Sequence, residues 1–142
     1  MLSTVAVGTD GSATAAKAVE AAAEIARRFD AKLVLLSVSQ DSSDELPDAG
    51  GVSEELQWAF NKHARVREML SRTEQELRER KIDCRTMVDE GDPAEVLVRL
   101  AEECGADLLV IGNRGMRRRM LGSVPNSVSH KAPCSVYVVK TT

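Results

Sequence analysis

The chain has 142 residues, of which 43% are hydrophobic, 29% are charged and only 3% are aromatic, and its formal net charge is −3. These totals are typical of one domain, residues 1–142, that hides about two-thirds of the surface exposed by its unfolded chain. The acidic balance argues against nucleic-acid binding, which usually requires a basic surplus, and the shortage of aromatic residues argues against a surface that stacks unpaired bases. No segment resembles a signal peptide or a membrane-spanning run, so we expect a cytoplasmic protein without membrane contact.

The cysteines do not have the spacing of metal ligands. Cys84, Cys104 and Cys134 lie far apart in the sequence and are odd in number. We therefore expect reduced, mostly buried thiols without a structural disulfide or a metal.

The first half of the chain predicts two strands and two helices. A valine-rich run from Thr4 to Gly8 predicts a buried strand, and Ser12 is a suitable N-cap for a helix whose apolar positions continue to Phe29. A second apolar run, Lys32 to Val38, is too short for a helix and predicts the next strand. A loop over residues 40–53 and a long helix from Ser53 to Lys81 follow.

The second half continues the alternation. Asp83 to Val88 predicts a strand, and Asp92 followed by proline starts a helix that Gly105 ends. The remaining predicted elements are a strand from Asp107 to Ile111, a helix capped by Ser123 that closes at Ala132-Pro133, and a strand from Val136 to Val139. Apolar strands that alternate with amphipathic helices indicate an α/β fold with a doubly wound, Rossmann-like parallel sheet covered on both faces.

Ligands of such sheets bind beyond the carboxyl ends of the strands, and two strand ends stand out here. The first strand ends in Gly8-Thr9-Asp10-Gly11, where small residues allow a ligand to approach the backbone. Asp10 is suited to hold a ribose hydroxyl or, through a cation such as Mg²⁺, a phosphate. The alternative interpretation, an ordinary turn between strand and helix, stays open for this segment.

The fourth strand ends in a second glycine-rich segment, Gly112-Asn113-Arg114-Gly115, and Gly122-Ser123-Val124 then starts the next helix. Glycine turns bring backbone N–H groups close to an anion, and a helix N-terminus favours negative charge. Arg114 and the three arginines of residues 117–119 lie in this segment, and a solvated basic loop is the favoured interpretation for those three. The glycines and Ser123 together favour phosphate binding, although the segment is neither a Walker A loop nor the dinucleotide fingerprint.

These motifs, in this order, resemble the universal stress protein family over essentially the whole chain. The residues that carry the resemblance are Val7-Gly8-Thr9-Asp10-Gly11-Ser12, Gly91-Asp92-Pro93, Ala106 to Gly112, Gly112 to Gly115, Leu121 to Val124 and Ala132 to Val136.

The resemblance implies a five-stranded parallel sheet of order 3-2-1-4-5, a homodimer formed through the last strand (Val136, Tyr137, Val138 and Val139) and an adenine-nucleotide site. It places Thr9 and Asp10 beside the nucleotide and the backbone of Val38 at the adenine edge, although an ordinary core valine is equally compatible with the sequence. It implies ribose and phosphate contacts from a larger set: Gly8, Gly112, Asn113, Arg114, Gly115, Gly122, Ser123 and Val124.

The sequence departs from the ATP-binding branch of that family in one place. That branch has glycine, two residues, glycine, nine residues, glycine and then serine or threonine, whereas only six residues separate Gly115 from Gly122 here. The shorter segment favours one phosphate over three, so cyclic AMP and AMP stand beside ATP as expected ligands.

Three functional hypotheses remain open. The leading one is a nucleotide-binding signalling module of the stress response. The second is a slow ATPase, but the chain offers no evident general base, because His63 and His130 fall on predicted helices where structural roles are favoured. The third is a dimeric scaffold with a vestigial site, which the short segment supports.

Overall fold

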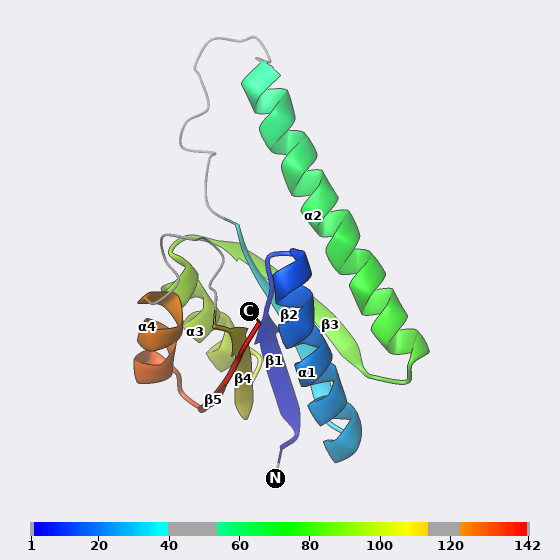
Figure 1. Cartoon of the computed structure of the whole chain (residues 1–142), viewed down its shortest axis with the longest axis vertical. Helices are drawn as coiled ribbons and strands as arrows, with labels where there is room; N and C mark the ends of the chain where they lie inside the picture. The colour runs from blue at the N-terminus through cyan, green and yellow to red at the C-terminus, as the bar shows by residue number, and fades with distance from the viewer. Residues whose placement is uncertain (1, 40–53, 114–122, 142) are drawn as a thin grey trace.

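The structure, a computed structural model, describes residues 2–39, 54–113 and 123–141, except for the side chains of 54–63 and 123. The elements alternate as predicted (Figure 1). In chain order they are β1 (Thr4–Gly8), α1 (Ala13–Phe29), β2 (Lys32–Ser39), α2 (Glu54–Glu79), β3 (Cys84–Glu90), α3 (Pro93–Glu103), β4 (Leu108–Gly112), α4 (Ser123–Lys131) and β5 (Ser135–Val139).

The five strands form one sheet of order β3-β2-β1-β4-β5, and every neighbouring pair is parallel. The predicted fold and strand order are therefore confirmed. The chain winds outward from β1 through β2 to β3, and α3 then carries it back to β4 on the other side of β1. The order of winding reverses between β1 and β4, which places the carboxyl ends of these two strands at the switch point of the sheet.

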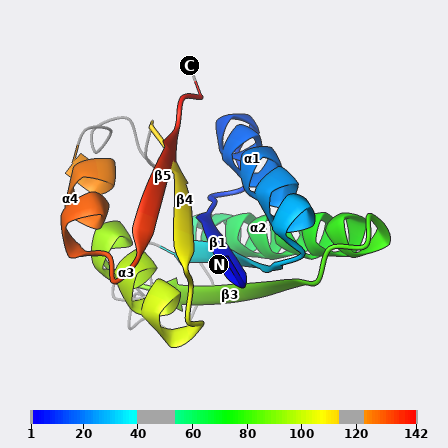
Figure 2. The ribbon, with the colours of Figure 1, turned by 90° about the horizontal axis from the view of Figure 1, so that it is seen from below.

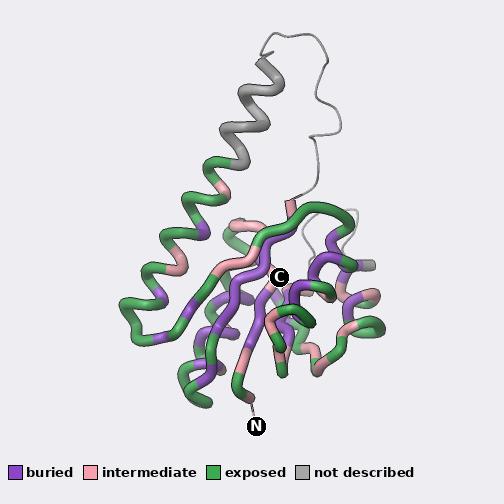
Figure 3. The backbone as a smooth tube through the Cα atoms, turned by 180° about the vertical axis from the view of Figure 1, so that it is seen from behind, coloured by how far each residue is buried: buried purple, intermediate pink, exposed green. Residues whose placement is uncertain are grey.

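Helices cover both faces of the sheet (Figure 2). On one face α1 and α2 pack on side chains such as Val5, Leu33 and Leu35. On the other face α3 and α4 pack on Ala6, Leu36 and neighbouring strand residues. Burial on both faces explains why the central strands are continuously apolar, and Figure 3 shows buried residues concentrated in these strands.

Local sequence signals fix the helix ends. Ser12 caps α1, its Oγ accepting a hydrogen bond from the Ala15 N–H at 3.1 Å, and Asp92 caps α3 in the same way through the Glu95 N–H at 3.2 Å. Gly105 follows α3 with φ +69°, a conformation that costs glycine little.

The structure differs from the sequence-based prediction at several boundaries. Phe29, assigned to the apolar face of α1, is 54% exposed and is the last residue of the helix. Strand β3 continues to Glu90, because its pairing with β2 runs to Ser39 and its polar residues lie at the edge of the sheet. Ser123 is the first residue of α4 and not the residue before it. The predicted loop over residues 40–53 lies outside the described residues.

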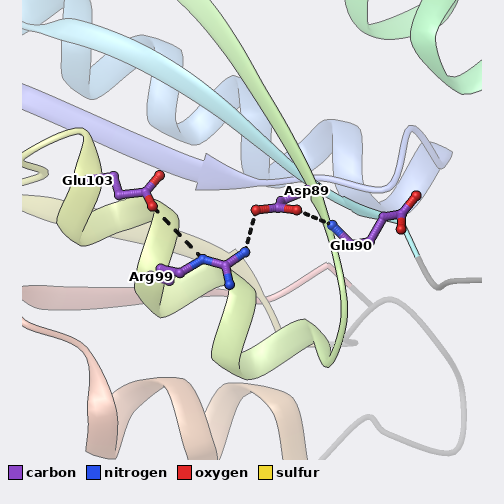
Figure 4. Close-up of polar contacts among 4 residues, drawn as sticks. All are labelled: Asp89, Glu90, Arg99 and Glu103. Carbon is purple, nitrogen blue, oxygen red and sulfur yellow. Dashed lines mark hydrogen bonds and ion pairs between the residues drawn. The ribbon is translucent and has the colours of Figure 1, made fainter.

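The carboxyl end of β3 is joined to α3 by an ion pair (Figure 4). Arg99 of α3 bonds to the Asp89 carboxylate, and its Nε lies 4.0 Å from Glu103. All three side chains are about half exposed, so we assign this network a small share of the stability. Within the described part of the chain, no helix has the length and apolar character needed to cross a bilayer.

Candidate functional site

A pocket lies at the switch point of the sheet, between the carboxyl ends of β1 and β4. It lies where the turn before α1 and the first turn of α4 converge. The residues that line it are Gly8, Thr9, Asp10, Ser12, Thr14, Ala15, Leu97, Ile111, Gly112, Val124 and Thr141.

The turn from β1 to α1 forms one wall and is internally hydrogen-bonded. The Thr9 N–H donates to the Leu36 carbonyl at 2.8 Å, and the Thr9 hydroxyl accepts from the Gly11 N–H at 3.1 Å. The Asp10 carboxylate accepts from the Ser12 N–H at 2.8 Å. Side chains of the turn thus accept from the amides of Gly11, Ser12 and Ala15, so the turn presents side chains to the pocket more than free N–H groups.

Two glycines at this turn have close neighbours, and one of them also has a positive φ. A Cβ on Gly8 would lie 3.0 Å from the Leu97 side chain, at the floor of the pocket. Gly11 has φ +81°, and a Cβ there would lie 3.1 Å from the Met69 sulfur of α2. This segment can therefore be both an ordinary turn between strand and helix and part of a ligand site. Its glycines carry no side chains, so a ligand in the pocket can approach the backbone.

The end of β4 forms the opposite wall together with the segment after β5. Gly112 packs closely on Thr141, because a Cβ on Gly112 would lie 3.2 Å from Thr141 Cγ2. The Asn113 side-chain oxygen accepts hydrogen bonds from the Thr141 N–H at 2.8 Å and from its hydroxyl at 3.0 Å. Sequence reasoning missed Thr141, which is only 3% exposed, because no local motif marks it.

Helix α4 brings its first turn to the pocket. Val124 is 4% exposed and lines the cavity. In the sequence Gly122 precedes this helix, and glycine has no side chain that could cap its first N–H groups. Such a helix start is better suited to an anion than the self-capped start of α1.

Most of the predicted residues that the structure describes come together in the pocket. Gly8, Thr9, Asp10, Gly112 and Val124 line it, and Asn113 adjoins it through Thr141. The predicted residues Arg114, Gly115 and Gly122, and the side chain of Ser123, lie outside the described residues.

Val38 does not line the pocket. Val38 is 8% exposed and belongs to the core between the sheet and α3. The proposed contact of its backbone with adenine stays a prediction.

The three cysteines and His130 are not among the residues that line the pocket. Burial raises the pKa of the Cys84 thiol to about 12, and the Glu74 carboxylate acts in the same direction. Burial likewise raises the pKa of Cys104 and Cys134. His130 is exposed in the last turn of α4, and the side chain of His63 lies outside the described residues. Among the described side chains, no group of three or more His, Cys, Asp or Glu residues is placed to hold a metal ion.

Known proteins are similar to this chain in sequence and in fold. A model of the universal stress protein family matches residues 1–140. A universal stress protein of Mycobacterium tuberculosis (strain H37Rv) is 37% identical over 145 residues, which cover 98% of this chain and 97% of that protein. A crystal structure of a universal stress protein in complex with cAMP has a TM-score of 0.67 at 29% identity and covers 99% of this chain and 98% of its own. An Arabidopsis thaliana family member with AMP bound shares the fold, with a TM-score of 0.68 at 23% identity, covering 97% of this chain and 91% of its own.

Proposed function

Because this chain belongs to the universal stress protein family, we propose that the pocket between β1 and β4 binds an adenine nucleotide. The observation that carries this proposal is the convergence of Gly8, Thr9 and Asp10 with Gly112 and Val124 on one pocket at the switch point. The structural relative that holds cAMP supports it independently.

The two helix starts suggest how the nucleotide is oriented. The amides of the α1 turn are largely satisfied by Thr9, Asp10 and Ser12, so this side suits the ribose, which needs side-chain acceptors and donors. The start of α4, preceded by glycine, suits the phosphate. With only six residues between Gly115 and Gly122, a single phosphate as in AMP or cyclic AMP is preferred over the three of ATP.

A bound triphosphate would bring Mg²⁺ with it. Asp10 is the one carboxylate that lines the pocket among the described residues, and Mg²⁺ in nucleotide sites commonly uses one or two carboxylates together with phosphate oxygens and water. The residues present therefore fit a metal ion that arrives with ATP better than one held by the protein alone.

The protein acts as a signalling module in the cytoplasm, and slow ATPase activity is the alternative. The pocket residues that the structure describes include donors and acceptors for binding, and Asp10 is the one carboxylate among them that would serve as a base. Occupancy of the pocket then changes affinity for a partner, and the protein works as a homodimer joined through β5.

Calorimetric titration of nucleotide-free protein with AMP, cyclic AMP and ATP tests the proposal. The matched variants are Ala15→Leu and Ala16→Leu, which add the same atoms to one helix with little change in helix propensity. Ala15 lines the pocket, whereas Ala16 is exposed. We expect saturable binding to the native protein, at least about a tenfold loss of affinity in Ala15→Leu and native affinity in Ala16→Leu. Absence of binding by all three nucleotides would refute the proposal.

A further inference from the structure

The segment that follows β5 is part of the pocket wall. Thr141 lies two residues beyond the end of β5, lines the pocket and is 3% exposed. A residue this deeply buried outside a regular element needs specific partners for its backbone and hydroxyl groups.

Both polar groups of the Thr141 backbone and its hydroxyl have partners from other elements. Asn113, just after β4, accepts from the N–H at 2.8 Å and from the hydroxyl at 3.0 Å through one side-chain oxygen. Lys17 of α1 donates from Nζ to the Thr141 carbonyl at 3.2 Å. Thr141 thus joins the β4 end of the pocket to α1, the helix that follows the other wall.

The N–H and the side-chain oxygen of Asn113 both form hydrogen bonds with β5 or with the segment that follows it. The Asn113 N–H donates to the Val139 carbonyl at 2.8 Å, and its side-chain oxygen already holds two donors. The close approach of Gly112 to Thr141 completes the packing. Asn113 therefore acts on the pocket by fixing Thr141, a role that its position in the glycine-rich segment does not reveal.

We propose that Asn113 and Lys17 are positioning residues that hold Thr141 in the wall of the nucleotide pocket, so that ordering of the segment after β5 and nucleotide binding are coupled. The proposal rests on the proposed nucleotide-binding function. Such coupling is reciprocal. A nucleotide that contacts this wall of the pocket must stabilise the segment after β5, and loss of the ordered segment must weaken nucleotide binding.

The first test is amide hydrogen exchange at Thr141, measured by NMR on the full chain with and without AMP. In the native protein, AMP at about one hundred times its dissociation constant should slow exchange at Thr141 by up to about one hundredfold. Asn113→Ala removes the acceptor and should speed exchange at Thr141 by roughly three- to tenfold without AMP, while exchange at Val7 in the core stays unchanged. Asn113→Asp keeps an oxygen acceptor and should retain the protection.

The second test compares Lys17→Met with Lys32→Met, which remove the same charge. Lys32 is exposed at the start of β2, at the opposite end of the sheet from the pocket. We expect Lys17→Met to weaken AMP binding roughly two- to tenfold and to speed exchange at Thr141, with neither effect in Lys32→Met. Lys17→Arg, which keeps a donor, should restore both properties.

The outcomes separate the two proposals. Two results would refute the coupling without affecting the proposed nucleotide site. One is that AMP binds the native protein but leaves exchange at Thr141 unchanged. The other is that Lys17→Met and Asn113→Ala bind AMP with native affinity. If AMP, cyclic AMP and ATP all fail to bind the native protein, the proposed function fails and the coupling falls with it, whatever the protection of Thr141.

Discussion

Residues distant in sequence define the pocket, and their roles follow from single hydrogen bonds. Thr9 and Asp10 hold the turn after β1, and Asn113 holds Thr141 across 28 positions of sequence. The turn was predictable because threonine, aspartate and glycine have strong local preferences. The contact with Thr141 was not, because it depends on where β5 ends relative to β4.

Asp107 provides a residue-scale test through pH. Its carboxylate accepts from the Ser3 N–H at 2.9 Å and the Thr4 N–H at 3.0 Å, and these bonds hold the pKa of Asp107 below its ordinary value. The ionised Asp107 carboxylate therefore stabilises the folded state fully above its unfolded-state pKa of about 4. This stabilisation is lost as pH falls through the lower folded-state pKa.

We expect Asp107→Asn to unfold at lower urea concentration than the native protein at pH 7, with the difference shrinking as pH falls below about 4. Asp83→Asn removes the same charge from an exposed position before β3 and serves as the control. A difference for Asp107→Asn that stays constant down to pH 2 would contradict this assignment.

At the scale of elements, burial of apolar side chains holds the helices in place. Leu77 of α2 is 2% exposed and belongs to the core that α1 and α2 form with the sheet. The ion pair between Arg80 and Glu20, at 2.9 Å, instead has side chains that are 41% and 63% exposed. Both contacts lie near the carboxyl end of α2. We expect the ion pair to contribute less to stability than the buried leucine, because water screens exposed ion pairs.

Leu77→Ala should therefore lower the free energy of unfolding by about 2–5 kcal/mol, and Glu20→Gln by less than about 1 kcal/mol. Urea denaturation followed by circular dichroism measures both. Equal losses in the two variants would contradict this assignment, because they would show that the exposed ion pair contributes as much as the buried leucine.

The elements themselves could be predicted from the sequence because their signals are local. Apolar runs marked the strands, and Ser12 and Asp92 marked helix starts that the structure confirms. The extension of β3 to Glu90 could not be predicted, because it depends on how far the neighbouring strand β2 offers hydrogen bonds. Helical periodicity likewise assigned Phe29 to the apolar face of α1 and did not show that this last residue of the helix is exposed. The sequence pattern likewise predicts that Val38 lies in a strand, but it does not predict whether Val38 lines the pocket, and it is not among the lining residues.

At the scale of the whole molecule, β3 and β5 are the edge strands of the sheet among the described residues. On β5, Tyr137 and Val138 are each 42% exposed, whereas Val139 is 9% exposed and packs in the core of its own chain. Of the residues proposed for the dimer, Tyr137 and Val138 thus offer side chains to a partner, and Val136 and Val139 offer mainly backbone. An unpaired edge strand invites pairing with another copy.

The two edges give a matched pair of variants for the dimer. Val88 on β3 is 47% exposed, close to the value for Val138. We expect the native protein and Val88→Lys to sediment as dimers at micromolar concentration and Val138→Lys to sediment as a monomer, because a buried lysine is costly at the contact. A native monomer, or a dimer disrupted only by Val88→Lys, would refute the β5 interface.

The most direct test of the central claim is an amide NMR titration of nucleotide-free protein with AMP. The pocket between β1 and β4 predicts saturable shifts at Thr9, Asp10, Gly112 and Val124, with Val88 on the far edge of the sheet unchanged. Saturable shifts confined to β3 or to the outer surface of α2, with the ends of β1 and β4 unaffected, would contradict it.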